Sequence, residues 1–126
     1  MKETLGILVL FAGLGACATY TTGASAPAQV ESGVLVDAKG MTLYTFDKDP
    51  AGAGKSVCVA QCAKNWPPLA AGADAKPTAG YAVIMREDGT RQWTYKGNPL
   101  YLWVKDEKPG DRTGDGFNNL WRVARP

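Results

Sequence analysis

The strongest constraint on the fold of this chain is a segment that occurs twice. Residues 39–49 read K-G-M-T-L-Y-T-F-D-K-D, and residues 96–106 read K-G-N-P-L-Y-L-W-V-K-D. Lysine, glycine, leucine, tyrosine, lysine and aspartate recur in register without a gap. Each copy is followed by a glycine- and lysine-containing stretch that leads to a tryptophan, Trp66 or Trp121. This self-match indicates that one structural unit has been duplicated.

Both copies have the spacing of β-strands. Tyr44 and Phe46 are two residues apart, as are Tyr101 and Trp103, so in a strand each pair of rings lies on one face. In the second copy the opposite face is also apolar, which predicts a strand buried on both sides. The residues of that opposite face are Leu100, Leu102 and Val104.

Two hairpins are predicted around these strands. Residues 34–36 (V-L-V) lead into the turn-forming residues 37–40 (D-A-K-G). A clearer hairpin joins residues 81–85 to residues 92–95 through the turn R-E-D-G at residues 86–89.

A short helix is predicted between the two copies, over residues 56–65. Ser56 can cap its amino terminus, and the Pro-Pro pair at residues 67–68 prevents its continuation. Asp49 and Asp106 fall just after the predicted strands, where a carboxylate most often accepts backbone N–H groups of a turn. We therefore expect a mainly β fold, a small antiparallel domain built from two related strand-turn repeats with one or two short helices.

Cys58 and Cys62 are the first candidates for chemistry. Four residues apart on a helix, their Cα atoms would be separated by about 6 Å, which a disulfide allows. In an oxidising compartment we expect a structural disulfide. A redox-active pair and a soft-metal site with Met41 or Met85 are the alternatives, although both methionines lie in apolar strand-like contexts that favour core packing.

The segment at residues 111–116, D-R-T-G-D-G, has the opening of a calcium-binding loop, with a glycine at the sixth position. The twelfth position should be a glutamate but is Arg122. A glycine-rich turn is therefore the preferred interpretation, and we expect no metal site and no cofactor.

Composition excludes several kinds of site. The 126 residues contain no histidine, which excludes Ser–His–Asp and Cys–His catalytic sites. The net charge is +2 with both signs interspersed, unlike the basic stripe of a nucleic-acid-binding protein. The carboxylates show no pairing that would nominate a general acid and base. We therefore expect a protein that is not an enzyme and does not bind nucleic acid.

The amino terminus has the parts of an export signal. Lys2 and the free amine supply positive charge, which Glu3 weakens, and an apolar run extends from residue 5 to residue 14. With a rise of about 1.5 Å per residue, this run is too short for a helix that crosses a hydrocarbon layer of about 30 Å. We expect residues 1–16 to be a signal peptide.

The next residues, L-G-A-C ending at Cys17, resemble the bacterial lipobox. This predicts a lipidated Cys17 followed by a flexible tether to residue 29, with the duplicated domain at residues 30–126. The membrane is then a partner of the chain through the lipid. Ala18 favours the outer membrane if the cell has two. Cleavage after Ala18 by the ordinary signal peptidase and retention of an uncleaved anchor remain open.

The repeated tyrosine, aromatic and aspartate residues resemble the motif of a bacterial family of secreted-repeat predicted lipoproteins. The segment C-x3-C-A-x2-W-P-P at residues 58–68 and the phrase G-x-P-L-Y at residues 97–101 also resemble this family. The resemblance implies a location in the cell envelope and a duplicated fold, and hardly any chemistry. It assigns the motif to Tyr44, Phe46, Asp49, Trp66, Tyr101, Trp103 and Asp106.

Three functions follow from these observations. The first is a non-enzymatic binding or structural module, with an envelope glycan or protein as ligand if some aromatic rings form an exposed row. The second is a periplasmic redox or metal-handling protein that uses Cys58 and Cys62. The third is a hydrolase of envelope material that uses carboxylates the sequence does not identify.

Overall fold

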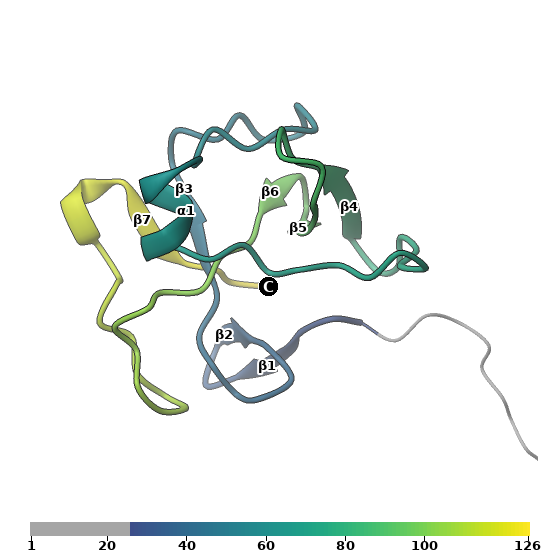
Figure 1. Ribbon diagram of the computed structural model, residues 1–126. Coiled ribbons are helices and arrows are strands. Elements are labelled where there is room, and N and C mark those ends of the chain that lie inside the picture. The colour runs from purple at the N-terminus through teal and green to yellow at the C-terminus, as the bar shows by residue number, and fades with distance from the viewer. Residues whose placement is uncertain (1–25) are drawn as a thin grey trace, which may run out of the picture.

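A computed structural model describes residues 26–126 (Figure 1). The predicted signal peptide, Cys17 and most of the tether lie outside the described residues. Among residues 26–126, no helix has the length and apolar character needed to cross a membrane.

The described part consists of short antiparallel strands with little helix, as predicted. The elements are β1 (Gln29–Glu31), β2 (Val34–Val36), β3 (Tyr44–Phe46), α1 (Gln61–Asn65), β4 (Tyr81–Met85), β5 (Arg91–Tyr95), β6 (Asn98–Pro99), the 3-10 helix η1 (Phe117–Asn119) and β7 (Trp121–Val123).

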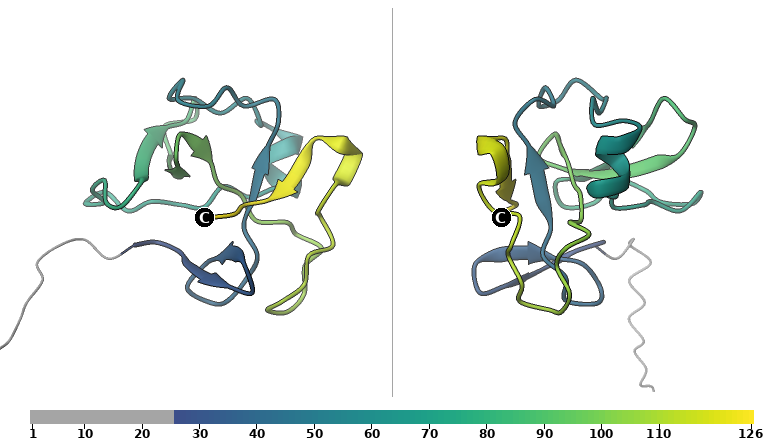
Figure 2. Two further views of the ribbon diagram at one scale, coloured as in Figure 1. Left: turned by 180° about the vertical axis from the view of Figure 1, so that it is seen from behind. Right: turned by 60° about the vertical axis from the view of Figure 1, so that its left-hand side comes forward.

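The strands form three small sheets. β1 pairs with β2, β3 pairs with β7, and β5 lies between β4 and β6. In Figures 1 and 2 the three-stranded sheet and the β7–η1 segment lie on opposite sides of the molecule, and the β1–β2 hairpin lies below them. β3 and β7 are far apart in sequence, so the carboxyl-terminal strand closes the fold against the first repeat.

Each repeat holds a segment of the other repeat in its hairpin. We call residues 66–70 the first arm and residues 121–125 the second arm. In the second arm, Ala124 accepts a hydrogen bond from Leu35 N at 2.8 Å and donates to Leu43 O at 2.8 Å, and both partners belong to the first repeat.

The first arm makes the corresponding bonds with the second repeat. Leu69 O accepts from Trp93 N at 2.9 Å, and Leu69 N donates to Leu100 O at 2.9 Å. Leu69 therefore corresponds to Ala124, and the two repeats exchange their arms. Because each arm completes the sheet of the other repeat, neither repeat has a full set of backbone partners alone.

The core has an aromatic part and an aliphatic part. The aromatic part contains or contacts the rings at residues 44 and 46 and those at residues 101 and 103. Each pair of rings therefore lies on one face of the chain, as the spacing predicts. The aromatic part contains Val34, Val36, Tyr44, Cys58, Trp66, Tyr101, Trp103, Trp121 and Val123. The second part contains Leu35, Leu43, Leu69, Tyr81, Trp93, Leu100 and Ala124.

The two predicted hairpin turns form. β4 and β5 pair in register from Tyr81 opposite Tyr95 to Met85 opposite Arg91, with Gly89 in the left-handed conformation that glycine adopts easily (φ 86°). The turn after β2 is closed by a hydrogen bond from Gly40 N to Asp37 O at 3.0 Å. The main partner of β2 is nevertheless β1, which the sequence analysis did not predict.

The prediction of a helix over residues 56–65 with a Ser56 cap is wrong at its amino end. The helix begins only at Gln61, after Ala60, whose φ of 54° is not helical. Ser56 is instead buried, and its hydroxyl is held in a hydrogen-bond network in the core. The side chain is therefore not available to the helix.

Two burial predictions for apolar residues are also wrong. Val104 is 51% exposed, so the second copy is not buried on both sides over residues 100–104. The strand β6 ends at Pro99, and Val104 lies in a turn. Met85 is 61% exposed because it ends β4 at the edge of its sheet. The spacing of apolar residues does not show where these strands end.

Candidate functional site

The two tyrosine–aspartate motifs are joined crosswise. Tyr44 of the first repeat donates a hydrogen bond to Oδ2 of Asp106 at 2.6 Å. Tyr101 of the second repeat donates to Oδ2 of Asp49. The two tyrosines also exchange backbone hydrogen bonds, each at 2.9 Å. Tyr44, Tyr101 and the two carboxylates are buried, so the paired motifs lie at the contact between the repeats.

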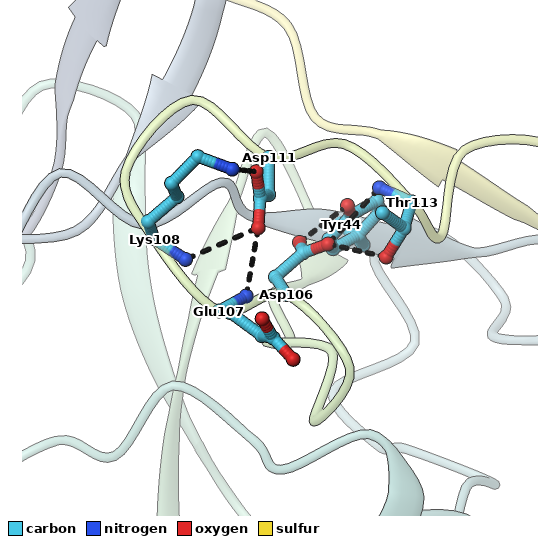
Figure 3. A network of polar contacts seen from close by, with 6 residues as sticks. All are labelled: Tyr44, Asp106, Glu107, Lys108, Asp111 and Thr113. Carbon is cyan, nitrogen blue, oxygen red and sulfur yellow. Dashed lines mark hydrogen bonds and ion pairs between the residues drawn. The ribbon is translucent and has the colours of Figure 1, made fainter.

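The second oxygen of each aspartate accepts from the chain that follows, as predicted for a carboxylate at a turn. Asp49 Oδ1 accepts from Val57 N at 2.7 Å. Asp106 Oδ1 accepts from the N–H and the hydroxyl of Thr113, at 3.0 and 2.6 Å (Figure 3). Both carboxylates therefore connect a tyrosine of one repeat to a loop of the other.

Burial governs the acidity of these groups. Desolvation, followed by the hydrogen bond to Asp106, raises the pKa of Tyr44 far above its ordinary value. Desolvation and the bond to Asp49 do the same for the pKa of Tyr101. Desolvation raises the pKa of Asp49 as well, although bonds from Tyr101 and Val57 oppose it. Both tyrosines therefore remain protonated donors at neutral pH.

A buried arginine extends the Asp49 network. Arg86, which is 6% exposed, donates through Nη1 to Ser56 Oγ at 2.9 Å and to Gln92 Oε1 at 2.7 Å. Its Nη2 donates to the carbonyl of Cys58. Ser56 Oγ lies 2.6 Å from the Tyr101 hydroxyl. Because the single tyrosine proton goes to Asp49, Ser56 is the donor in this contact.

The sequence pattern does not identify Arg86 as a core residue. Arg86 belongs to the predicted turn between β4 and β5, where a charged side chain is ordinarily solvated. Its burial depends on the loop at residues 56–58, which comes from the other repeat. No signal in the local sequence identifies that contact.

Cys58 and Cys62 form a disulfide, with their Cα atoms 5.2 Å apart. The pairing agrees with the prediction, although only Cys62 lies on the helix. Cys58 is fully buried in the aromatic part of the core. The disulfide thus fixes the loop that supplies Ser56 and the carbonyl acceptor of Arg86.

The large aromatic rings stack inside the molecule. Trp66 lies between Trp121, at a centroid distance of 3.8 Å, and Trp103, at 3.9 Å, and Phe46 stacks on the other face of Trp121 at 4.2 Å. Trp66, Trp103 and Trp121 are at most 6% exposed. These rings are therefore core, and this row is not an exposed platform for a ligand.

Residues 111–116 form a turn, the preferred interpretation. The carboxylate of Asp111 accepts from the N–H groups of Glu107 and Lys108 and pairs with Lys108 Nζ at 2.9 Å (Figure 3). Asp115 Oδ1 accepts from Val123 N at 3.2 Å. Within the described residues, no cluster of three or more histidine, cysteine or acidic side chains has an arrangement that would hold a metal ion.

Comparison with protein families assigns this duplicated architecture. The model of the Lipoprotein_15 family, a secreted repeat of unknown function, matches the chain at residues 28–70 and again at residues 82–125. The chain belongs to this family. The two matches end with the first and second arms, so this secreted-repeat protein contains two family units that exchange their last segments. Membership indicates an extracellular or envelope location. No curated protein and no solved structure matches the chain significantly.

Proposed function

We propose that this secreted-repeat protein is a lipoprotein, anchored in the cell envelope through Cys17, whose domain is a non-enzymatic binding or structural module. The crossed Tyr44–Asp106 and Tyr101–Asp49 bonds carry the proposal. They bury four polar side chains that would otherwise be the first candidates for acid–base chemistry. Their bonds go to each other and to neighbouring loops, which supports a role in holding the two repeats together.

The stacked tryptophans and the disulfide support the same proposal. Together they make a rigid scaffold from a small domain, because aromatic stacking and a covalent link both restrict internal motion. A rigid scaffold on a lipid-anchored tether presents a surface to other envelope components.

The anchor is tested by replacing Cys17 with serine and labelling cells with palmitate. We expect the wild-type chain to incorporate label and the Cys17→Ser chain to lose it, with impaired processing. Cys62→Ser is the matched control, because it removes a cysteine from the folded domain and should leave labelling intact. Unchanged labelling of Cys17→Ser would overturn the anchor.

Binding is tested by co-sedimentation of the detergent-solubilised protein with the insoluble wall fraction of the bacterium that produces it. We expect saturable retention of the protein in the pellet. A protein that stays in the supernatant at every concentration of wall material would contradict a wall-binding module.

The second candidate is redox or metal handling by Cys58 and Cys62. The disulfide, with Cys58 fully buried, supports a structural role instead. Intact mass after treatment with a thiol alkylating agent, without reductant or denaturant, distinguishes the two. An unmodified, metal-free mass supports the scaffold. Alkylated thiols or a bound metal would favour redox or metal handling.

A further inference from the structure

The second arm lines a surface cavity of about 360 Å³ that is distinct from the crossed motifs. The cavity lies where this arm meets β3 and the turn between β5 and β6. Three of the residues that line it are cationic: Lys96, Arg122 and Arg125. Its volume falls in the lower part of the range of small-molecule sites.

Two of these cations form no ion pair with the residues that the structure describes. Among residues 26–126, neither Lys96 nor Arg125 has a carboxylate within ion-pairing distance. Lys96 Nζ lies 5.2 Å from the centre of the Tyr95 ring, and Arg125 donates a long 3.4 Å hydrogen bond to Gly33 O. Arg122 is paired with Asp47 through Nε and Nη2. The cavity therefore has a positive lining with donors to spare.

The fold does not require arginine at these arm positions. Because Leu69 corresponds to Ala124, the counterparts of Arg122 and Arg125 in the first arm are Pro67 and Ala70. Although the first arm has these uncharged residues in place of the arginines, Leu69 makes the same two backbone hydrogen bonds that Ala124 makes in the second arm. Lys96, moreover, has a φ of 49°, which lysine adopts less readily than glycine or asparagine.

The other residues of the lining favour an anion that also carries hydroxyl groups. The lining residues also include Tyr95, Asn98 and Asp115, which carry an aromatic ring, an amide and a carboxylate. The hydrogen bond from Val123 N goes to Oδ1 of Asp115, so this bond does not occupy Oδ2. A carboxylate repels a ligand that is only an anion, but accepts hydrogen bonds from hydroxyl groups. An aromatic ring packs against the apolar face of a sugar.

From this combination we propose that the cavity binds a saccharide that carries an acidic group, with Lys96 and Arg125 contacting the acid and Tyr95, Asn98 and Asp115 contacting the sugar. This inference rests on the proposed function and names the chemical class of its ligand. A carboxylate and a phosphate on the sugar share the chemistry that the two cations recognise.

The experiment is isothermal titration calorimetry on the full-length protein in non-ionic detergent. The probes are digalacturonate, glucose 6-phosphate and their uncharged counterparts, digalacturonate dimethyl ester and glucose. We expect saturable binding of at least one acidic sugar, weakening with added salt, and at least about tenfold weaker binding of its uncharged counterpart. The two acidic probes distinguish a carboxylate from a phosphate.

The variant Lys96→Gln/Arg125→Gln should lower the affinity for the acidic probe by about tenfold or more. The matched control is Lys76→Gln/Arg112→Gln, because it makes the same charge change and Arg112, like Arg125, donates to a carbonyl of the β1–β2 turn, at Ser32. The control should bind as the wild type does. Equal weakening in both variants would overturn the site.

The site also fails if neither acidic sugar binds the wild type at up to about 10 mM, a concentration beyond weak specific affinities, or if the uncharged sugars bind equally well. Co-sedimentation with the wall fraction separates this failure from that of the proposed function. If the protein binds the wall fraction but no acidic sugar, the proposed saccharide site is refuted and the proposed wall-binding module stands. Absence of both would refute the saccharide site and the wall-binding module.

Discussion

The hydroxyl of Tyr44 donates a 2.6 Å hydrogen bond to Oδ2 of Asp106, 62 positions further along the chain. The same bond, from Tyr101 to Asp49, runs in the opposite direction between the repeats. Each tyrosine thus satisfies the aspartate of the other copy. A motif that is local in sequence becomes complete only when the two copies meet.

Removing one of these tyrosine hydroxyls should destabilise the folded protein. We expect Tyr44→Phe and Tyr101→Phe each to lower the free energy of unfolding by about 2 kcal/mol, because a buried carboxylate loses a charge-assisted hydrogen bond. Urea denaturation followed by tryptophan fluorescence measures the change. Tyr81→Phe is the control, since its ring is also buried but its hydroxyl belongs to neither pair. A loss no greater than in this control would contradict the role of the pairs.

The protein should lose stability in alkali. Folding raises the pKa of Tyr44 and Tyr101 above that of an unfolded tyrosine, about 10. Their contribution is therefore fully present below pH 10 and is lost as the pH rises from there toward the folded values. Unfolding free energies measured between neutral pH and pH 11 should fall at the upper end. The Tyr44→Phe/Tyr101→Phe variant should show a smaller slope; an identical slope would refute this assignment.

Arg86 should stabilise the fold through the hydrogen bonds of its planar guanidinium group as well as through its charge. We expect Arg86→Met to lower the free energy of unfolding by about 3 kcal/mol, because Ser56, Gln92 and the Cys58 carbonyl lose a buried partner. Arg86→Lys should recover only part of this, since an ammonium group does not reproduce the planar geometry. Thermal melts give the order of the three proteins. Equal melting temperatures for wild type and Arg86→Met would show that the network contributes nothing.

Exchange of the arms predicts that the halves stay together after the chain is cut between them. A protease site inserted after Lys76, in an exposed loop between the repeats, should be cleaved without loss of the fold. The two fragments should co-elute on gel filtration and separate only in denaturant. A second protein, cut after Lys39 within the first hairpin, is the comparison. Separation of the halves under native conditions after cleavage at Lys76 would contradict the exchange.

The sequence by itself determined the class of fold and its duplication. The period of two around Tyr44 and Phe46 fixes which rings share a face, and the R-E-D-G turn between two strand-like segments fixes the β4–β5 hairpin. The spacing of Cys58 and Cys62 favoured the disulfide, although the helix assumed for both residues contains only Cys62. These features depend on residues that are close along the chain, where local geometry leaves few alternatives.

Only the tertiary structure decided that the arm of each repeat pairs with the hairpin of the other repeat. Nothing near Leu69 or Ala124 in sequence indicates that each pairs with the hairpin of the other copy, because equivalent strands offer the same backbone donors and acceptors. The burial of Ser56 and Arg86 depends on the contact between loop 56–58 and the β4–β5 turn, which are far apart in the sequence. Met85 is exposed because β4 ends there, and Val104 because it lies in a turn. The cavity lined by Lys96 and Arg125 likewise exists only where the arm crosses. Pairing between distant segments depends on the packed whole, which local periodicity does not encode.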